Sequence, residues 1–161
     1  MIVLGLDQAL QRSGYAIYKD NNLVDYGYFD VPANYPIEQR LGEIWKHLNE
    51  LYNQYDFNLL AFEDVQQQFN VETFKRLCYV QSSILLWCYY NDVKYEILTP
   101  SHWRSVIGKG WGKKREEQKE YAINWVRQKF NIECNSDTAD AICIGWAATQ
   151  ERSKDTKESA F

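Results

Sequence analysis

Apolar and polar positions along the chain predict a set of strands followed by helices. The opening stretch IVLGLD at 2–7 is almost continuously apolar, as expected of a central strand buried on both faces. Further strands are predicted at 14–18 and about 23–31, and the polar KDNN between them is typical of a hairpin turn. We therefore expect three consecutive antiparallel strands at the start of the chain.

Beyond these strands, apolar residues recur at the three- and four-residue spacing of helices. Pro36 is suited to begin a helix, and the helical spacing continues to residue 52. A short buried strand is predicted at 58–63, a long helix at 72–91, and then a fifth strand, KYEIL, which stops at Pro100.

The last third of the chain predicts two more helices, from about residue 116 to 130 and from 137 to 150. Asn135 or Ser136 is suited to cap the second of them. This order of elements implies an α/β fold, with a mixed five-stranded sheet, antiparallel in its first three strands, and helices on its faces.

Length and composition narrow the class of protein. With 161 residues there is room for one domain with a sizeable core, which we assign to residues 1–150, and a polar tail at 151–161 that we expect to fray. The 45% hydrophobic content excludes general disorder. The chain start lacks a basic signal-peptide region, and the longest later apolar run, ILLWCYY, is too short to cross a bilayer. Four cysteines without a Cys-x-x-Cys pair indicate buried, reduced thiols and a cytoplasmic location.

Acidic residues interrupt stretches that otherwise look buried. Asp7 ends the first apolar strand, Glu63 ends the fourth strand, and Asp137 and Asp140 share one face of the last helix. If the first and fourth strands are neighbours, Asp7 and Glu63 converge at the carboxyl edge of the sheet. Four clustered carboxylates repel one another unless cations lie between them, and such oxygen ligands select Mg²⁺ or Mn²⁺. A pair of these ions can hydrolyse a phosphodiester.

Each acid also has a simpler explanation. Asp7 alone could begin a turn, and Asp137 could be a first-turn acid favoured by the helix dipole. Glu63 could lie on the surface at a strand end, where its neighbour Asp64 is a rival for any role. Taken together, in this order and on these elements, the four acids favour the metal site.

Three stretches, GLDQALQRSGYAIY, LLAFEDV and DTADA, give the chain a resemblance to the RNase H-like superfamily over about residues 1–150. It resembles most closely Holliday junction resolvases of the RuvC type, in a phage or prophage form. The resemblance implies a homodimeric, metal-dependent endonuclease that nicks four-way DNA junctions in symmetric pairs, with no small-molecule cofactor and no membrane contact. It implies two Mg²⁺ ions per active site, replaceable by Mn²⁺, held by a catalytic tetrad of Asp7, Glu63, Asp137 and Asp140.

Two departures from the family pattern concern contacts with DNA. Gln8 and Ala9 stand where the bacterial form usually has Pro-Gly after the first acid. The family places an aromatic wedge three residues after the Glu, where this chain has Gln66, and the nearest aromatic residue is Phe69. Phe69 is a candidate for DNA contact, the residue that replaces the wedge stays open, and the metal tetrad is unaffected.

Positive charge gathers in residues 101–129, which hold eight Lys or Arg and three Glu in a chain of net charge −4. The stretch GKGWGKKR combines basic residues that can neutralise phosphates with glycines that allow close approach and an aromatic that can stack on a base. The DNA-binding candidates here are Arg104, Lys109, Trp111, Lys113, Lys114 and Arg115. By resemblance, Arg104 and Lys113 or Lys114 lie near the scissile phosphate. The alternative is a flexible, solvated loop that leads into a helix.

Several other questions stay open at this stage. The helix at 72–91 carries Trp87, Tyr89 and Tyr90 beyond a single apolar stripe, which suits packing against a second subunit. A phosphotransferase of the actin and sugar-kinase type needs two such domains, for which the chain is too short. Another RNase H-like nuclease, acting on RNA–DNA hybrids or other branched substrates, and a non-catalytic DNA-binding module remain as alternatives.

Overall fold

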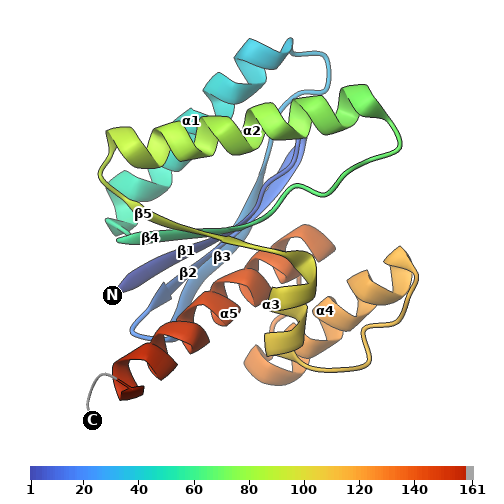
Figure 1. The fold of residues 1–161 in the computed structure, drawn as a ribbon. Coiled ribbons are helices and arrows are strands. Elements are labelled where there is room, and N and C mark those ends of the chain that lie inside the picture. The colour runs from blue at the N-terminus through green and yellow to red at the C-terminus, as the bar shows by residue number, and fades with distance from the viewer. Residues whose placement is uncertain (159–161) are drawn as a thin grey trace.

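A mixed five-stranded sheet forms the centre of the protein, with helices on both faces (Figure 1). The computed structural model describes residues 1–158, and side chains as far as Ser153. The strands are β1 (Ile2–Asp7), β2 (Arg12–Lys19), β3 (Asn22–Asp30), β4 (Leu59–Glu63) and β5 (Lys94–Leu98). Their order is β3-β2-β1-β4-β5; β1, β2 and β3 are antiparallel, and β4 and β5 run parallel to β1. The predicted fold class is confirmed.

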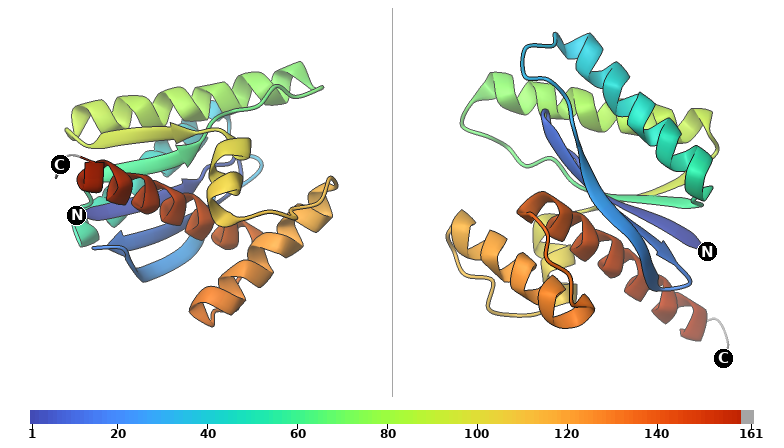
Figure 2. Two further views of the ribbon diagram at one scale, coloured as in Figure 1. Left: turned by 60° about the horizontal axis from the view of Figure 1, so that its bottom comes forward. Right: turned by 180° about the vertical axis from the view of Figure 1, so that it is seen from behind.

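The helices form two layers. They are α1 (Ile37–Tyr55), α2 (Val71–Tyr90), α3 (Pro100–Ile107), α4 (Arg115–Phe130) and α5 (Ser136–Glu158). Helices α1 and α2 cover one face of the sheet, while α5 crosses the other face and carries α3 and α4 on its outer side (Figures 1 and 2). Each layer has its own apolar core, centred on buried residues such as Trp87 on the first face and Trp103 on the second. No helix within residues 1–158 is long and apolar enough to cross a membrane.

Helix α3 is the element that the sequence pattern did not predict. Pro100 does more than stop β5: it is the first residue of α3, a position where proline's missing N–H costs nothing. Thr99 caps this helix by accepting a hydrogen bond from the His102 backbone N–H. Helix α5 also runs past the predicted end at residue 150, so the expected frayed tail overlaps it; residues 159–161 lie outside the described part of the chain.

The sequence suggested that Trp87 belongs to the exposed surface of α2, but the structure buries it. Its ring is fully buried against Phe57 and Tyr52, and its indole N–H donates to Asn49 Oδ1 at 2.8 Å. Because an indole buried without a partner for its N–H would be costly, this bond explains why the side chain turns inward. Tyr89 is exposed, as expected.

Two glycine contacts press α5 against the sheet. A Cβ atom on Gly5 in β1 would lie 2.6 Å from the Cα of Gly145 in α5, and one on Gly14 in β2 would lie 2.0 Å from the Asp137 carbonyl oxygen. Only residues without a Cβ permit so close an approach. Because Gly14 pairs with Asp7 across the sheet, these contacts bring the first turns of α5 to the carboxyl end of β1.

Candidate active site

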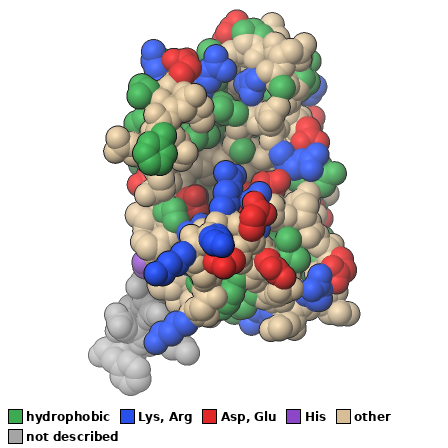
Figure 3. Space-filling model, turned by 90° about the vertical axis from the view of Figure 1, so that its right-hand side faces the viewer, with side chains coloured by type: hydrophobic (Ala, Val, Ile, Leu, Met, Phe, Trp, Pro, Cys, Tyr) green, Lys and Arg blue, Asp and Glu red, His purple; other side chains and the backbone are tan. Residues whose placement is uncertain are grey.

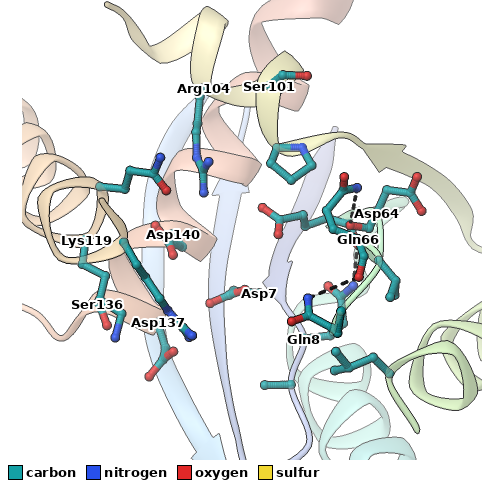
Figure 4. Close-up of a pocket in the computed structure, with 18 of the residues that line it drawn as sticks. Asp7, Gln8, Asp64, Gln66, Ser101, Arg104, Lys119, Ser136, Asp137 and Asp140 are labelled. Atoms are coloured by element: carbon teal, nitrogen blue, oxygen red, sulfur yellow. Dashed lines mark hydrogen bonds between the residues drawn. The ribbon is translucent and has the colours of Figure 1, made fainter. Parts of the chain in front are cut away.

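The four predicted acids line one hollow of about 860 Å³ at the carboxyl ends of β1 and β4 (Figure 4). Strands β1 and β4 are parallel neighbours, with Leu6 opposite Phe62, so Asp7 and Glu63 leave the sheet side by side. Asp137 and Asp140 reach the same hollow from the start of α5. The expected convergence of the four carboxylates on one site is therefore what the fold produces.

Burial and mutual repulsion make the charged state of these acids unfavourable. Burial raises the pKa of Asp7 well above its usual value, and the charges of Asp140, Glu63 and Asp137 raise it further, while Arg115 lowers it. Burial and then the charge of Glu63 raise the pKa of Asp140 to about 7. Acids held in this way are typical of functional sites, because their charges need a partner that the carboxylates themselves do not supply.

Glu63 is held by two neighbours that were not predicted to matter. The indole N–H of Trp103 donates to Glu63 Oε2 at 2.7 Å, and the Gln8 side-chain amide donates to the Glu63 carbonyl oxygen. Burial raises the pKa of Glu63, and the Trp103 hydrogen bond and the Arg104 charge both oppose this shift. Its neighbour Asp64 also lines the hollow.

Asp137 lies in the first turn of α5, so the helix dipole favours its charge, as the simpler explanation expected. Asn135 caps α5, because its side-chain oxygen accepts a hydrogen bond from the Thr138 backbone N–H at 2.8 Å. Asp137 is therefore not the side chain that caps the helix and instead lines the hollow.

Positive side chains surround the acids. Among the predicted DNA-binding residues, Arg104, Lys113 and Arg115 line the hollow, whereas Lys109 and Lys114 do not. Lys119 lines it as well, although it was not predicted as a site residue. Figure 3 shows Lys and Arg side chains gathered beside the hollowed part of this face, with acidic side chains among them. A negatively charged strand would meet this positive rim before it reached the acids.

The glycine-rich loop before α4 is organised by its aromatic residue. Trp111 packs on Tyr121 with ring centroids 4.3 Å apart, and its indole N–H donates to the carbonyl oxygens of Arg104 and Gly108. Gly112 adopts a φ of 76°, which other residues rarely take. These contacts favour a role for Trp111 in holding the loop over our expectation that it stacks on a base.

Phe69 lies on the connection between β4 and α2. Its side chain is entirely exposed, and it lies outside the residues that line the hollow. Gln66, where the resemblance led us to expect an aromatic residue, does line the hollow.

Comparison with known proteins decides the family. A family model described as "Crossover junction endodeoxyribonuclease RuvC" matches residues 3–148. The chain belongs to the RuvC family. It is thus a structure-specific endodeoxyribonuclease of the class that acts on crossover junctions.

Relatives and solved structures agree with this assignment. The RuvC of Dictyoglomus thermophilum is 28% identical over 158 residues, covering 94% of this chain and 99% of that protein. The RuvC of Brachyspira hyodysenteriae is 29% identical over 151 residues, covering 91% and 92%. The structure of T. thermophilus RuvC in complex with Holliday junction substrate has a TM-score of 0.78 at 17% identity, covering 95% and 96%. The Fowlpox virus resolvase, solved with substrate Holliday junction DNA, has a TM-score of 0.65 at 17% identity, covering 94% and 99%. At these identities the two structures show a shared fold.

RuvC-family nucleases generally depend on divalent metal ions, and the donor set of the hollow fits a hard cation. It offers carboxylate oxygens, the ligands that Mg²⁺ and Mn²⁺ prefer. In the described residues, no three His, Cys, Asp or Glu side chains lie close enough together to hold a metal ion. Metal binding by any three of the four acids that line the hollow would therefore require their side chains to rotate from the orientations seen here.

Two residues at the hollow were not predicted from the sequence, and only one of them could have been. Lys119 lies four residues after Arg115 on α4, so helical spacing alone could have placed both on one side. Trp103 could not have been assigned to Glu63, because their contact joins residues 40 positions apart and depends on the unpredicted α3.

Proposed function

We propose that this protein resolves four-way DNA junctions by paired, symmetric nicks, and that each strand is cut at the carboxylate hollow. The observation that carries the proposal is the convergence of the four acids under a rim of basic side chains. Membership of the RuvC family and the solved resolvase–junction complexes support the substrate. We place this activity in the cytoplasm, because all four cysteines are free thiols.

We assign metal binding to Asp7, Glu63, Asp137 and Asp140, with two Mg²⁺ ions, replaceable by Mn²⁺, as the cofactor. When bound, such ions supply an activated water and stabilise the leaving oxygen of the phosphodiester. The chain's own contribution is to bring the elements that carry the four carboxylates to one hollow, by close packing of α5 against β1 and β2.

Basic residues of the rim bind the phosphates beside the scissile bond. Arg104 is best placed for this role, because it lines the hollow and its guanidinium lies 5.1 Å from the centre of the Trp103 ring and 5.6 Å from that of Trp111. Its Nε atom is buried and has no hydrogen-bond partner among the described residues. Arginine suits this task because its planar fork can bind phosphate oxygens in pairs.

Residues outside the hollow contact DNA farther from the cut. Lys109 and Lys114 lie on the same loop and bind flanking phosphates, while Trp111 keeps that loop in shape. Phe69, fully exposed on the loop after β4, stacks on a base near the junction centre.

Paired nicks require two active sites, and we propose a homodimer. The face of α2 that turns away from the core exposes Leu86, Tyr89 and Tyr90, at 53%, 79% and 72% of their surface. Exposed apolar residues gathered in this way are typical of an interface. A second copy packing here would cover them.

A substrate panel tests the proposed function. Purified protein is incubated with labelled four-way junction, fork, duplex and RNA–DNA hybrid, with and without Mg²⁺, beside Glu63→Gln and the control Glu50→Gln, an exposed residue of α1. We expect Mg²⁺-dependent, symmetric cleavage of the junction by the wild type and by Glu50→Gln, and none by Glu63→Gln. Preferential cleavage of the hybrid would support another RNase H-like nuclease, and binding without cleavage would support a non-catalytic module.

The basic rim predicts a measurable salt dependence. Replacing Lys113 or Lys119 with Ala should weaken binding to every DNA sequence alike and reduce the slope of log affinity against log salt by about one unit for each phosphate that is no longer neutralised. Lys46→Ala is the matched control, since Lys46 is exposed on α1 across the sheet. An unchanged slope in the Lys113/Lys119 double variant would show that DNA is held elsewhere.

A further inference from the structure

Trp103 connects the apolar core to the acids of the hollow. It lies on α3, it is fully buried, and its indole N–H donates to Glu63 Oε2 at 2.7 Å. An indole N–H can donate a hydrogen bond, but it neither accepts one nor ligates a metal. The Trp103 N–H can therefore act on the hollow only through the carboxylate that accepts its hydrogen bond, Glu63.

The Trp103 ring is a fixed donor. It packs edge-on against Trp111 with centroids 5.3 Å apart at 89°, and it belongs to the buried cluster that includes Ile107 and Ala122. Glu63, by contrast, has a long side chain with several rotamers, and it lies at the very end of β4. The hydrogen bond commits one carboxylate oxygen, Oε2, to a donor held in the packed core, and leaves Oε1 for other partners.

We propose that Trp103 is a positioning residue, whose N–H fixes the Glu63 carboxylate in the orientation that binds a divalent ion. The inference rests on the proposed function, in which Glu63 is a metal ligand. Partners that orient a ligating side chain from outside the metal shell commonly affect metal affinity or activity about 10–100-fold. The Trp103–Glu63 hydrogen bond predicts that removal of one buried N–H changes metal binding, although Trp103 itself is not a metal ligand.

The chain offers a matched control in Trp87. That residue is also fully buried, and its indole N–H donates to Asn49 Oδ1 at 2.8 Å, but it lies on the opposite face of the sheet. Trp103→Phe and Trp87→Phe therefore each remove one buried indole N–H and its bond while keeping an aromatic ring. Thermal unfolding of both variants checks that they fold and compares their losses of stability.

The experiment measures Mn²⁺ binding to DNA-free protein, from the electron paramagnetic resonance signal of free Mn²⁺. We expect about tenfold weaker binding in Trp103→Phe, at the lower end of the range for such partners, and a similar rise in the Mg²⁺ concentration needed for half-maximal cleavage. Trp87→Phe should change neither. Wild-type Mn²⁺ affinity in Trp103→Phe, or an equal loss in Trp87→Phe, would overturn the inference.

Glu63→Gln separates this inference from the proposed function. If Glu63→Gln loses Mn²⁺ binding while Trp103→Phe keeps it, the ligand assignment stands and the positioning role is wrong. If Glu63→Gln binds Mn²⁺ as the wild type does, both are wrong.

A measurement on the wild type covers the case in which Trp103→Phe does not fold. In ¹⁵N-tryptophan-labelled protein, Mg²⁺ should shift the indole N–H resonance of Trp103, but not those of Trp87 and Trp45, which donate to Asn49 and Ser83. A Trp103 resonance that ignores Mg²⁺ would count against the inference.

Discussion

Replacing Asp7 or Asp140 with Asn is expected to abolish junction cleavage while leaving junction binding intact or tighter. Each carboxylate is a proposed metal ligand; removal of one oxyanion-hole donor already costs about 10²–10³ in rate, and loss of a metal ligand should cost at least as much. Binding should not suffer, because the substitution removes negative charge from beside the phosphates. Single-turnover cleavage and gel-shift titration of the same labelled junction measure the two effects separately.

Asp30→Asn is the matched control for Asp7→Asn. Asp30 also ends a strand, but it is exposed and pairs with Arg12 on the surface, at 2.7 Å between Arg12 Nε and Asp30 Oδ1. An exposed ion pair contributes little to stability, so cleavage by this variant should stay at the wild-type level. Wild-type cleavage by Asp140→Asn would contradict the tetrad.

The same substitutions should not destabilise the protein. Asp7 is buried and surrounded by three other acids, so its charge opposes folding in the absence of cations. Asp7→Asn is expected to keep or raise the midpoint of thermal unfolding measured without divalent ions. Lost activity with retained stability is what distinguishes a functional acid from a structural one.

The fold and the shared location of the four acids could be predicted, because much of the signal for each is local. A carboxylate at the end of a continuous apolar strand, as with Asp7, conflicts with the cost of burying charge, and that conflict is visible in the sequence alone. The spacing of Asp137 and Asp140 likewise follows from helix geometry. The parallel pairing of β1 with β4 then brought Glu63 to them, as expected.

The remaining features depend on contacts between distant parts of the chain. Trp87 and Tyr89 are close neighbours on α2, yet one is buried beside Phe57 and the other is exposed, and composition cannot distinguish them. Trp111 looked free to stack on DNA because its partner Tyr121 lies on another element. The pattern of apolar residues predicts which positions are buried, but it does not show which neighbour each side chain contacts.

The role of two glycines within apolar elements could not be predicted from the sequence pattern. Gly5 interrupts an apolar strand and Gly145 an apolar helix, where each lowers the local propensity. Their near contact in the structure explains both, since a Cβ on either would collide with the facing element. This close packing, rather than any single acid, sets the distance between α5 and the end of β1.

Chelation of divalent ions is expected to stop cleavage completely while leaving junction binding in place. The hollow brings together acids whose charges repel, and hard cations are the partners that such oxygen ligands select. Mg²⁺ and Mn²⁺ should restore cleavage after EDTA treatment. Ca²⁺ should bind without supporting turnover, because its larger and more flexible coordination shell holds the reacting oxygens less well. If the basic rim holds the DNA, as proposed, gel-shift affinity in EDTA should stay close to that in Ca²⁺. Full cleavage in excess EDTA would contradict a metal-dependent mechanism, and loss of junction binding in EDTA would show that the ions, rather than the basic rim, hold the substrate.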